Sequence, residues 1–332
     1  MEENIIQKIR NSKLRGRGGG NFETWIKWDL VKKSLEKDKY IICNGAEGEL
    51  DVSKDGYILD NYLEDVVSGI LIAINEVDAK KAYFYLRSDY YLKYKSALAS
   101  LIKDKPIIIF EKPNIGYIGG EETTICEIIE GKSGMPRIKP PYLTEKGLFG
   151  CPTLINNIET FYCVNRISKD EYSGERFYSL SGDIKNKGVF VFQEDTSIEE
   201  ILRRTDNYPS FDFFVQSGGG ASGEFLLPED ISISVFGIGS IIVFNRQTTD
   251  IYSLIEKIME FFHRGNCDKC VPCREGSFMI YEMAKNRKIN HKKMEEIIYS
   301  LENSSFCALG KSIAIPLKSI FKKILKDGKN KI

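Results

Sequence analysis

Four of the eight cysteines in the 332-residue sequence have the spacing of metal ligands. Cys267, Cys270 and Cys273 follow one another at every third position, and Cys307 comes 34 residues later. Three thiolates at this spacing can bind three corners of an iron–sulfur cubane, and the segment that follows is long enough for a helical hairpin that returns the fourth. We therefore predict that these four cysteines hold a [4Fe–4S] cluster.

Zinc is the alternative metal for the same cysteines. Four-cysteine zinc sites usually pair two separated C-x-x-C motifs, so the three-plus-one arrangement favours the cluster. Structural thiols without a metal are the remaining alternative. The other four cysteines are scattered through apolar or loop segments and are interpreted as free thiols, most of them buried. They are Cys43, Cys126, Cys151 and Cys163.

A second candidate site is the glycine-rich loop Gly16–Gly20, which precedes a helix expected over 22–35. Glycines let the backbone approach a phosphate closely, and the start of a helix supplies oriented N–H groups. The loop departs from the G-x-G-x-x-G pattern because Asn21 stands where the third glycine belongs. A flexible basic loop without a ligand is the alternative.

Two acidic segments follow positions where ligands often bind. Asn44–Glu49 begins at the end of the first expected strand, and ligands of open α/β sheets bind beyond the carboxyl ends of strands. A solvated acidic turn is equally compatible with it. Glu121 and Glu122 follow two glycines. They indicate the start of a helix, which favours negative charge, more than an acid–base pair.

The elements that must position these residues change along the chain. In the first half, strands alternate with helices, which indicates a parallel sheet covered on both faces. The expected strands are 40–44, 82–86 and 107–110, and the expected helices are 57–77, 90–102 and 154–167. Between them, residues 132–152 show few periodic signals, and a loop of that length is usually functional or disordered.

The second half begins with short strands and ends in helices. Strand-like runs surround one helix and indicate a small α+β module of the β-grasp kind. These runs are 177–181, 189–192, 211–215 and 241–244, with the helix at 197–203. Helical periodicity then predicts a C-terminal bundle with helices at 251–264, 274–286, 291–303 and 308–326.

Composition places the chain among ordinary globular proteins. It is 42% hydrophobic and 28% charged, and its formal net charge is zero, so no global field attracts nucleic acid. The N-terminus lacks the pattern of a signal peptide, and no apolar run is long enough for membrane insertion. We expect a cytoplasmic protein, in which clustered cysteines stay reduced and can bind metal.

Taken together, these motifs resemble the NADH-binding flavoprotein subunit of respiratory complex I. Relatives of that subunit serve NAD-linked hydrogenases, formate dehydrogenases and electron-bifurcating complexes. Besides the cysteine set Cys267–Gly276 with Phe306–Leu309, the similar segments are Leu14–Gly19, Lys27–Trp28, Ile42–Asn44, Lys54–Asp55, Gly119–Thr123, Pro136–Tyr142, Gly147–Gly150, Asn156–Thr160 and Ser181–Gly182.

The resemblance implies an α/β fold in three parts. Residues 1–170 would form a Rossmann-like domain for FMN and NADH, residues 171–248 a β-grasp domain of the SLBB-like kind, and residues 249–332 a helical bundle with the cluster. FMN would be bound by Gly16, Arg17, Gly18, Lys27, Asn44, Glu47, Tyr117, Gly120, Glu121, Glu122, Asn156, Asn157 and Thr160. NADH would contact Phe22, Glu49, Lys139 and Tyr142.

The activity implied by the resemblance is that of an NADH dehydrogenase-type oxidoreductase subunit. Hydride would pass from NADH to FMN, and single electrons would pass to the cluster; no side chain need transfer a proton. Phe22 and Tyr142 would stack on the adenine. The implied partners are a thioredoxin-like [2Fe–2S] subunit and a larger iron–sulfur or hydrogenase-type subunit.

The sequence departs from the family around the flavin. Where the family reads Gly-Ala-Gly-Phe-Pro-Thr-Gly, Asn21 and Trp25 replace glycines and Glu23 replaces proline. Ala46 stands where the family has a carboxylate. These differences leave a second hypothesis, a non-catalytic paralogue that serves as scaffold and electron wire with an altered or empty flavin site. A zinc-stapled β-grasp binding module is a third.

Overall fold

The computed structural model describes residues 4–325. The chain forms two compact units. The first comprises the chain up to Glu47 together with Ser53–Asn114 and Gly119–Phe177. The second comprises Gly48–Val52, Ile115–Ile118 and the chain from Tyr178 onward. Two short segments from the first half of the sequence therefore belong to the second unit. The predicted domain boundaries at 170 and 248 stay a prediction.

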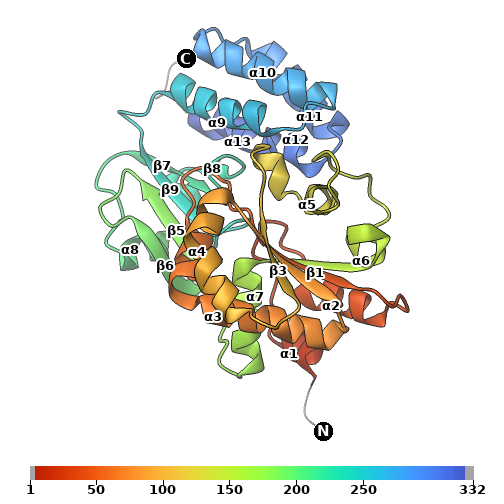
Figure 1. Ribbon diagram of the computed structural model, residues 1–332. Helices are drawn as coiled ribbons and strands as arrows, with labels where there is room; N and C mark the ends of the chain where they lie inside the picture. The colour runs from red at the N-terminus through yellow and green to blue at the C-terminus, as the bar shows by residue number, and fades with distance from the viewer. Residues whose placement is uncertain (1–3, 326–332) are drawn as a thin grey trace. The chain divides into compact units, whose positions relative to one another are not determined.

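The first unit is an α/β structure in which helices and parallel strands alternate (Figure 1). Its elements are α1 (Ile5–Asn11), α2 (Thr24–Lys33), β1 (Tyr40–Gly45), α3 (Lys54–Val77), β2 (Lys81–Leu86), α4 (Ser88–Leu101), β3 (Ile107–Glu111), α5 (Glu122–Ile129), α6 (Leu143–Lys146), β4 (Thr153–Asn157) and α7 (Ile158–Ser168). The strand order is β3-β2-β1-β4, and all three pairings are parallel. The prediction of a parallel sheet is confirmed.

The register of this sheet brings two candidate segments together. Asn44 at the end of β1 pairs with Asn157 at the end of β4, so both side chains emerge at the same edge. Behind the sheet, α3 packs closely against α7. Gly69 permits this approach, because a Cβ there would lie 2.0 Å from the Phe161 carbonyl oxygen.

The helix predicted over 154–167 is wrong at its beginning. Residues 153–157 form β4, and α7 starts only at Ile158, where the Asn157 side chain accepts a hydrogen bond from the Glu159 N–H at 3.0 Å. Pairing with β1 overrides the helical pattern of this apolar run. The segment 132–152, which showed few periodic signals, contains α6 and a 3₁₀ turn at Leu148–Gly150.

The second unit contains a mixed sheet with one covering helix. Its elements are β5 (Glu175–Gly182, whose first residues belong to the first unit), β6 (Gly188–Gln193), α8 (Ile198–Arg204), β7 (Phe213–Ser217), β8 (Glu224–Leu226) and β9 (Ser240–Asn245). The order is β6-β5-β9-β7-β8. β9 runs parallel to β5 and antiparallel to β7. Ile198, Ile201 and Leu202 of α8 pack into the core on this sheet.

A helical region follows the mixed sheet. It consists of α9 (Ile251–Gly265), α10 (Val271–Lys285), α11 (His291–Ser304), α12 (Ala308–Ser312), α13 (Ala314–Ser319) and a π-helical turn (Ile320–Leu325). The last helix, predicted as continuous from 308 to 326, is interrupted at Ile313, and residue 326 lies outside the described residues. Pro316 has no N–H to bond the carbonyl of Ser312, which explains the interruption.

Candidate functional site

The glycine-rich loop is the tip of a short backbone hairpin. Gly16 N–H donates to the Phe22 carbonyl at 2.8 Å, and Thr24 N–H donates to the Leu14 carbonyl at 3.1 Å. At the tip, no acceptor within residues 4–325 receives a hydrogen bond from the N–H groups of Gly18, Gly19 or Gly20. Successive N–H donors of this kind form a cradle for an anion, and this loop fits the phosphate of a flavin nucleotide.

The residues that replace glycine and proline in this loop have local partners. Asn21 adopts a φ of +46°, the left-handed conformation that glycine takes most easily. The Glu23 carboxylate accepts a hydrogen bond from Trp25 Nε1 at 2.9 Å and lies 3.7 Å from the guanidinium of Arg15. Arg10 of α1 stacks over the Trp25 ring at 4.8 Å. The charge of Glu23 is therefore offset at the base of the hairpin, and its carboxylate is bonded there.

The strand ends and the loop meet at Asn157. Its Nδ2 donates to the Asn44 carbonyl at 3.3 Å, and Asn44 Nδ2 donates to the Gly120 carbonyl at 3.0 Å. A Cβ on Gly18 would lie 3.2 Å from the Asn157 Cβ, so the loop packs directly on this side chain. Asn156 is 5% exposed, and its Oδ1 accepts a hydrogen bond from Trp28 Nε1 at 3.0 Å. The structure thus brings together the predicted residues of the loop, β1, β4 and Gly120.

Beneath these residues lies a buried group of charges. Lys54 Nζ lies 2.6 Å from the Asp55 carboxylate and 3.1 Å from that of Glu159. Burial alone would lower the pKa of Lys54, but these two carboxylates raise it above its ordinary value. Asp55 also accepts a hydrogen bond from Asn157 Nδ2 at 2.7 Å. Removing one partner of such a buried pair typically costs about 3–5 kcal/mol, so the group fixes the Asn157 side chain firmly.

Arg17 belongs to the same buried group rather than to the loop surface. Its side chain is 1% exposed, its Nε lies 3.9 Å from the Glu159 carboxylate, and its Nη2 donates to the Tyr172 hydroxyl at 2.8 Å. Its backbone N–H donates to Thr160 Oγ1 at 3.1 Å. Arg17 and Thr160, both predicted to bind FMN, therefore contact each other and lie within the interior. Glu159 and Lys54 were not predicted as site residues.

The predicted acidic residues have different surroundings. Glu47 accepts hydrogen bonds from the Asp55 N–H at 3.0 Å and the Tyr90 hydroxyl at 2.6 Å, at the start of α3. Burial, assisted by the Asp55 carboxylate, raises the pKa of Glu47 to about 6. Glu121 caps α5, because its carboxylate accepts hydrogen bonds from the N–H groups of Thr123 and Thr124. The expectation of a helix start at Glu121 and Glu122 is confirmed.

Glu122 joins a flavin-site lysine to a nucleotide-site lysine. Its carboxylate lies 3.2 Å from Lys27 Nζ and 2.5 Å from Lys139 Nζ. Burial raises the pKa of Glu122, but the two ammonium groups outweigh it and hold the pKa at about 2. Phe22 and Tyr142 are 47% and 57% exposed, so both aromatic faces are open to a ligand. These contacts fit a dinucleotide-binding surface on the first unit.

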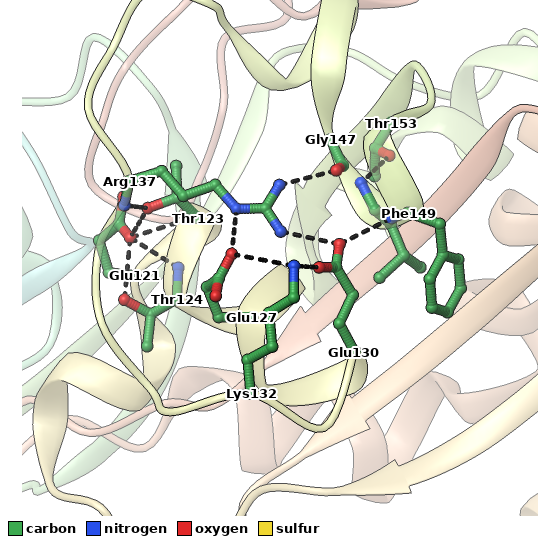
Figure 2. Close-up of polar contacts among 11 residues, drawn as sticks. Glu121, Thr123, Thr124, Glu127, Glu130, Lys132, Arg137, Gly147, Phe149 and Thr153 are labelled. Carbon is green, nitrogen blue, oxygen red and sulfur yellow. Dashed lines mark hydrogen bonds and ion pairs between the residues drawn. The ribbon is translucent and has the colours of Figure 1, made fainter.

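A cluster around Arg137 was missed at the sequence level. Figure 2 shows its guanidinium between Glu127, Glu130 and the Gly147 carbonyl oxygen. The three contacts measure 2.5, 2.7 and 2.7 Å. Because Arg137 is separated from its partners by seven to ten residues outside any regular element, no periodic pattern could reveal the cluster.

Glu49 and Tyr117 lie in the second unit. Glu49 is 6% exposed, and its carboxylate accepts hydrogen bonds from the Ala221 N–H at 2.8 Å and the Ser222 hydroxyl at 2.5 Å. The Tyr117 hydroxyl donates to the same carboxylate at 3.0 Å. In this conformation Glu49 fixes the loop that carries Gly219, and its role toward a nucleotide stays a prediction.

The four candidate cluster ligands gather in the helical region. Cys270 precedes α10, Cys273 lies in its first turn, and Cys307 precedes α12. Burial raises the pKa of the Cys273 thiol, and the neighbouring thiols Cys270, Cys307 and Cys267 raise it further. A Cβ on Gly310 would lie 3.1 Å from the Cys273 Cβ, so this glycine lets α12 approach.

This donor set suits a [4Fe–4S] cluster, because three thiols lie near a fourth that is largely buried. In the part of the chain that the structure describes, no three His, Cys, Asp or Glu side chains are arranged to hold a metal ion. The assignment of the four cysteines as cluster ligands stays a prediction. Among residues 4–325, no helix has the length and apolar character needed to cross a membrane.

Comparisons with known proteins give the family. The family model described as the Nuo51 FMN-binding domain matches residues 9–166, and that of the NADH-ubiquinone oxidoreductase-F iron-sulfur binding region matches 253–329. The corresponding NADH-quinone oxidoreductase-F chain of Rickettsia bellii is 30% identical over 100% of this chain and 90% of its own length. This chain belongs to the NADH-quinone oxidoreductase-F family. The member numbered 2 in Rhizobium meliloti is 28% identical over 96% of this chain and 86% of its own.

The oxidoreductase-F family extends to NAD-reducing hydrogenases. The alpha subunit of the NAD-reducing hydrogenase HoxS of Cupriavidus necator is 29% identical over 99% of this chain. A crystal structure of an NAD⁺-reducing [NiFe]-hydrogenase in the H₂-reduced state superposes with a TM-score of 0.88 at 26% identity over 98% of this chain. This chain spans 61% and 62% of the lengths of those two hydrogenase chains.

Proposed function

We propose that this chain is an NADH-oxidising or NAD-reducing subunit that binds FMN and a [4Fe–4S] cluster within a multisubunit oxidoreductase. The observation that carries this function is the glycine-rich loop. It combines three consecutive N–H donors without a protein acceptor in the described residues with the packing of Gly18 on Asn157. A backbone cradle of this form suits a phosphate group.

Each part of the chain has its own task in this function. FMN, when bound, supplies the exchange between two-electron hydride chemistry and single-electron transfer. The first unit, which we take to be Rossmann-like, holds the phosphate with the N–H groups of the loop and orients the nucleotide through Lys27, Lys139 and Glu122. Phe22 and Tyr142 offer exposed rings to the adenine. No side chain of this site needs to move a proton.

The second unit supplies the cluster site and the rest of the electron path. We take its mixed sheet to be a β-grasp domain of the SLBB-like kind and its helices to be the cluster-binding bundle, with Cys267, Cys270, Cys273 and Cys307 as ligands. Electrons that leave one subunit need an acceptor. A thioredoxin-like [2Fe–2S] subunit and a larger iron–sulfur or hydrogenase-type subunit are the proposed partners, and the cytoplasm is the proposed compartment.

The alternative, a paralogue with an empty flavin site, rests on Glu23, Trp25 and Ala46. Two observations favour the flavin-binding form over it. The Glu23 charge is offset by Arg15 and the Trp25 indole, and Asn21 keeps the backbone conformation of a glycine. Neither replacement closes the cradle formed by Gly18–Gly20.

The test is a pair of reciprocal variants of the anaerobically purified protein. We expect about one FMN and about four irons with matching acid-labile sulfide per wild-type chain. Gly18→Ala, whose new Cβ would lie 3.2 Å from Asn157, should lose FMN and retain iron. Cys273→Ser should lose iron and retain FMN. Four irons without FMN in the wild type, even after incubation with excess FMN, would establish the paralogue instead.

A further inference from the structure

The segment that carries Lys139 and Tyr142 has little packing of its own. Residues 138–142 are all exposed, and a hollow of about 600 Å³ lined by Arg137, Pro141 and Phe149 lies beside them. The stretch is held only where it begins and where it ends. At its end the buried side chain of Leu143 anchors it, and at its beginning Arg137 does.

Arg137 fixes this segment to α5 by side chain and backbone together (Figure 2). Its guanidinium bonds Glu127 and Glu130, which lie three residues apart on the same face of the last turn of α5. Its backbone N–H donates to Thr123 Oγ1 at 2.8 Å, near the start of α5. The same side chain also reaches the Gly147 carbonyl oxygen on the far side of Tyr142.

The carboxylate at the centre of this cluster is more sheltered than that of a surface ion pair. The Glu130 side chain is 6% exposed, whereas Lys132, which pairs with it at 2.6 Å, is 57% exposed. Burial raises the pKa of Glu130, but Lys132 and Arg137 outweigh it, so the carboxylate stays ionised. Charge-assisted, forked contacts to Arg137 should therefore hold more strongly than the exposed contact to Lys132.

We propose that Arg137 is a positioning residue that sets the affinity for the nicotinamide dinucleotide by holding residues 138–142 in their binding conformation. The inference rests on the proposed function, since it takes Lys139 and Tyr142 as nucleotide contacts. Arg137 touches no ligand. A segment ordered in advance loses less conformational entropy on binding, so loss of the strap weakens binding and leaves the hydride step unchanged.

The experiment compares Arg137→Gln with Lys132→Gln in the complete, cofactor-loaded protein. The two changes each remove one positive charge from the same cluster, but only the first removes the strap. Arg137→Gln should raise KM for NADH about ten- to hundredfold with kcat within about twofold. Arg137→Lys should recover part of the affinity, and Lys132→Gln should match the wild type.

Hydrogen exchange of the peptide covering 133–150 gives a readout that needs no nucleotide. It should be accelerated in Arg137→Gln and unchanged in Lys132→Gln. Unchanged exchange, unchanged KM, or a fall in kcat alone would each overturn the proposal. Should Arg137→Gln fail to fold, Glu127→Gln removes one contact of the guanidinium and should give a smaller rise in KM. A wild-type protein that binds no NADH would overturn the proposed function, while exchange would still report on the strap.

Discussion

Asn21 illustrates how one residue can preserve a turn that its type seems to disrupt. With φ at +46°, it occupies the left-handed region, which asparagine tolerates better than other side chains that carry a Cβ. The sequence alone counts Asn21 as a lost glycine. The structure shows that the backbone conformation is retained, because the short amide side chain clashes little with the neighbouring carbonyl.

Substitutions at position 21 should therefore separate conformation from chemistry. Asn21→Gly should change the free energy of unfolding by less than about 0.5 kcal/mol, whereas the β-branched Asn21→Val should lower it by about 1–2 kcal/mol. Urea titration of the two variants measures both values. A valine variant as stable as the glycine variant would show that the loop relaxes away from this conformation.

Glu47 should make stability depend on pH between about 4.5 and 6. Its folded-state pKa is raised to about 6, above the ordinary value of 4.5, so the folded protein binds the proton more tightly than the unfolded chain. Its contribution is fully present below pH 4.5 and is lost as the pH rises through 6. The difference in unfolding free energy between wild type and Glu47→Gln should fall across this window in urea titrations. A difference that rises with pH would contradict the assignment.

The predictability of a site residue depends on how far away its partners are in the sequence. Glu121 bonds the N–H groups two and three positions later, and its role as the start of a helix could be read from the residues beside it. Arg17 bonds Thr160, which is 143 positions away, and its side chain turned out to be buried. Local pattern identified the loop, but it could not distinguish a backbone contribution from a side-chain contribution.

At the scale of elements, the contact between α3 and α7 depends on a single missing methyl group. Gly69→Ala would place a Cβ 2.0 Å from the Phe161 carbonyl oxygen, and neither helix backbone can yield without moving the other. We expect a loss of at least about 1–3 kcal/mol of unfolding free energy. Ser68→Ala, one position earlier on a less buried face, is the matched control. Equal midpoints for both variants in chemical denaturation would show that the helices separate freely.

The elements themselves were largely predictable, and the failures share one cause. Strands bounded by polar turns, such as β1 and β2, match their predicted positions closely. β4 was taken for helix because its apolar run continues without a break into α7. β8 was missed because it has only three residues. In both cases the strand exists because a neighbour pairs with it, and pairing over long sequence distances leaves no local pattern.

At the scale of the whole molecule, the order of the sequence and the composition of the units differ. Sequence reasoning divided the chain into three consecutive parts. In the structure, Gly48–Val52 and Ile115–Ile118 belong with the chain after Tyr178. Tyr117 packs its ring against Phe261 at 4.8 Å and bonds Glu49, which in turn bonds the loop at Ser222. The second unit is therefore incomplete without residues from the first half of the chain.

A fragment that begins at Tyr178 should consequently not fold as the unit does in the complete protein. Without Glu49, the N–H groups of Ala221 and Ser222 lose their carboxylate acceptor. We expect the fragment to lack a cooperative thermal transition by near-ultraviolet circular dichroism, and co-expression with residues 1–177 to restore it. A cooperative transition in the isolated fragment would show that the two short segments are dispensable.

The bond between Glu49 and Ser222 also sets an order of events at the ribosome. The two residues are 173 positions apart, so Glu49 leaves the exit tunnel long before its partner has been translated. Domains usually fold in turn as they emerge, but here the second unit can close only after most of the chain has been made. The same arrangement constrains genetic exchange: a recombination event near codon 178 would import a new Ser222 loop and leave behind the old Glu49 that must bond it.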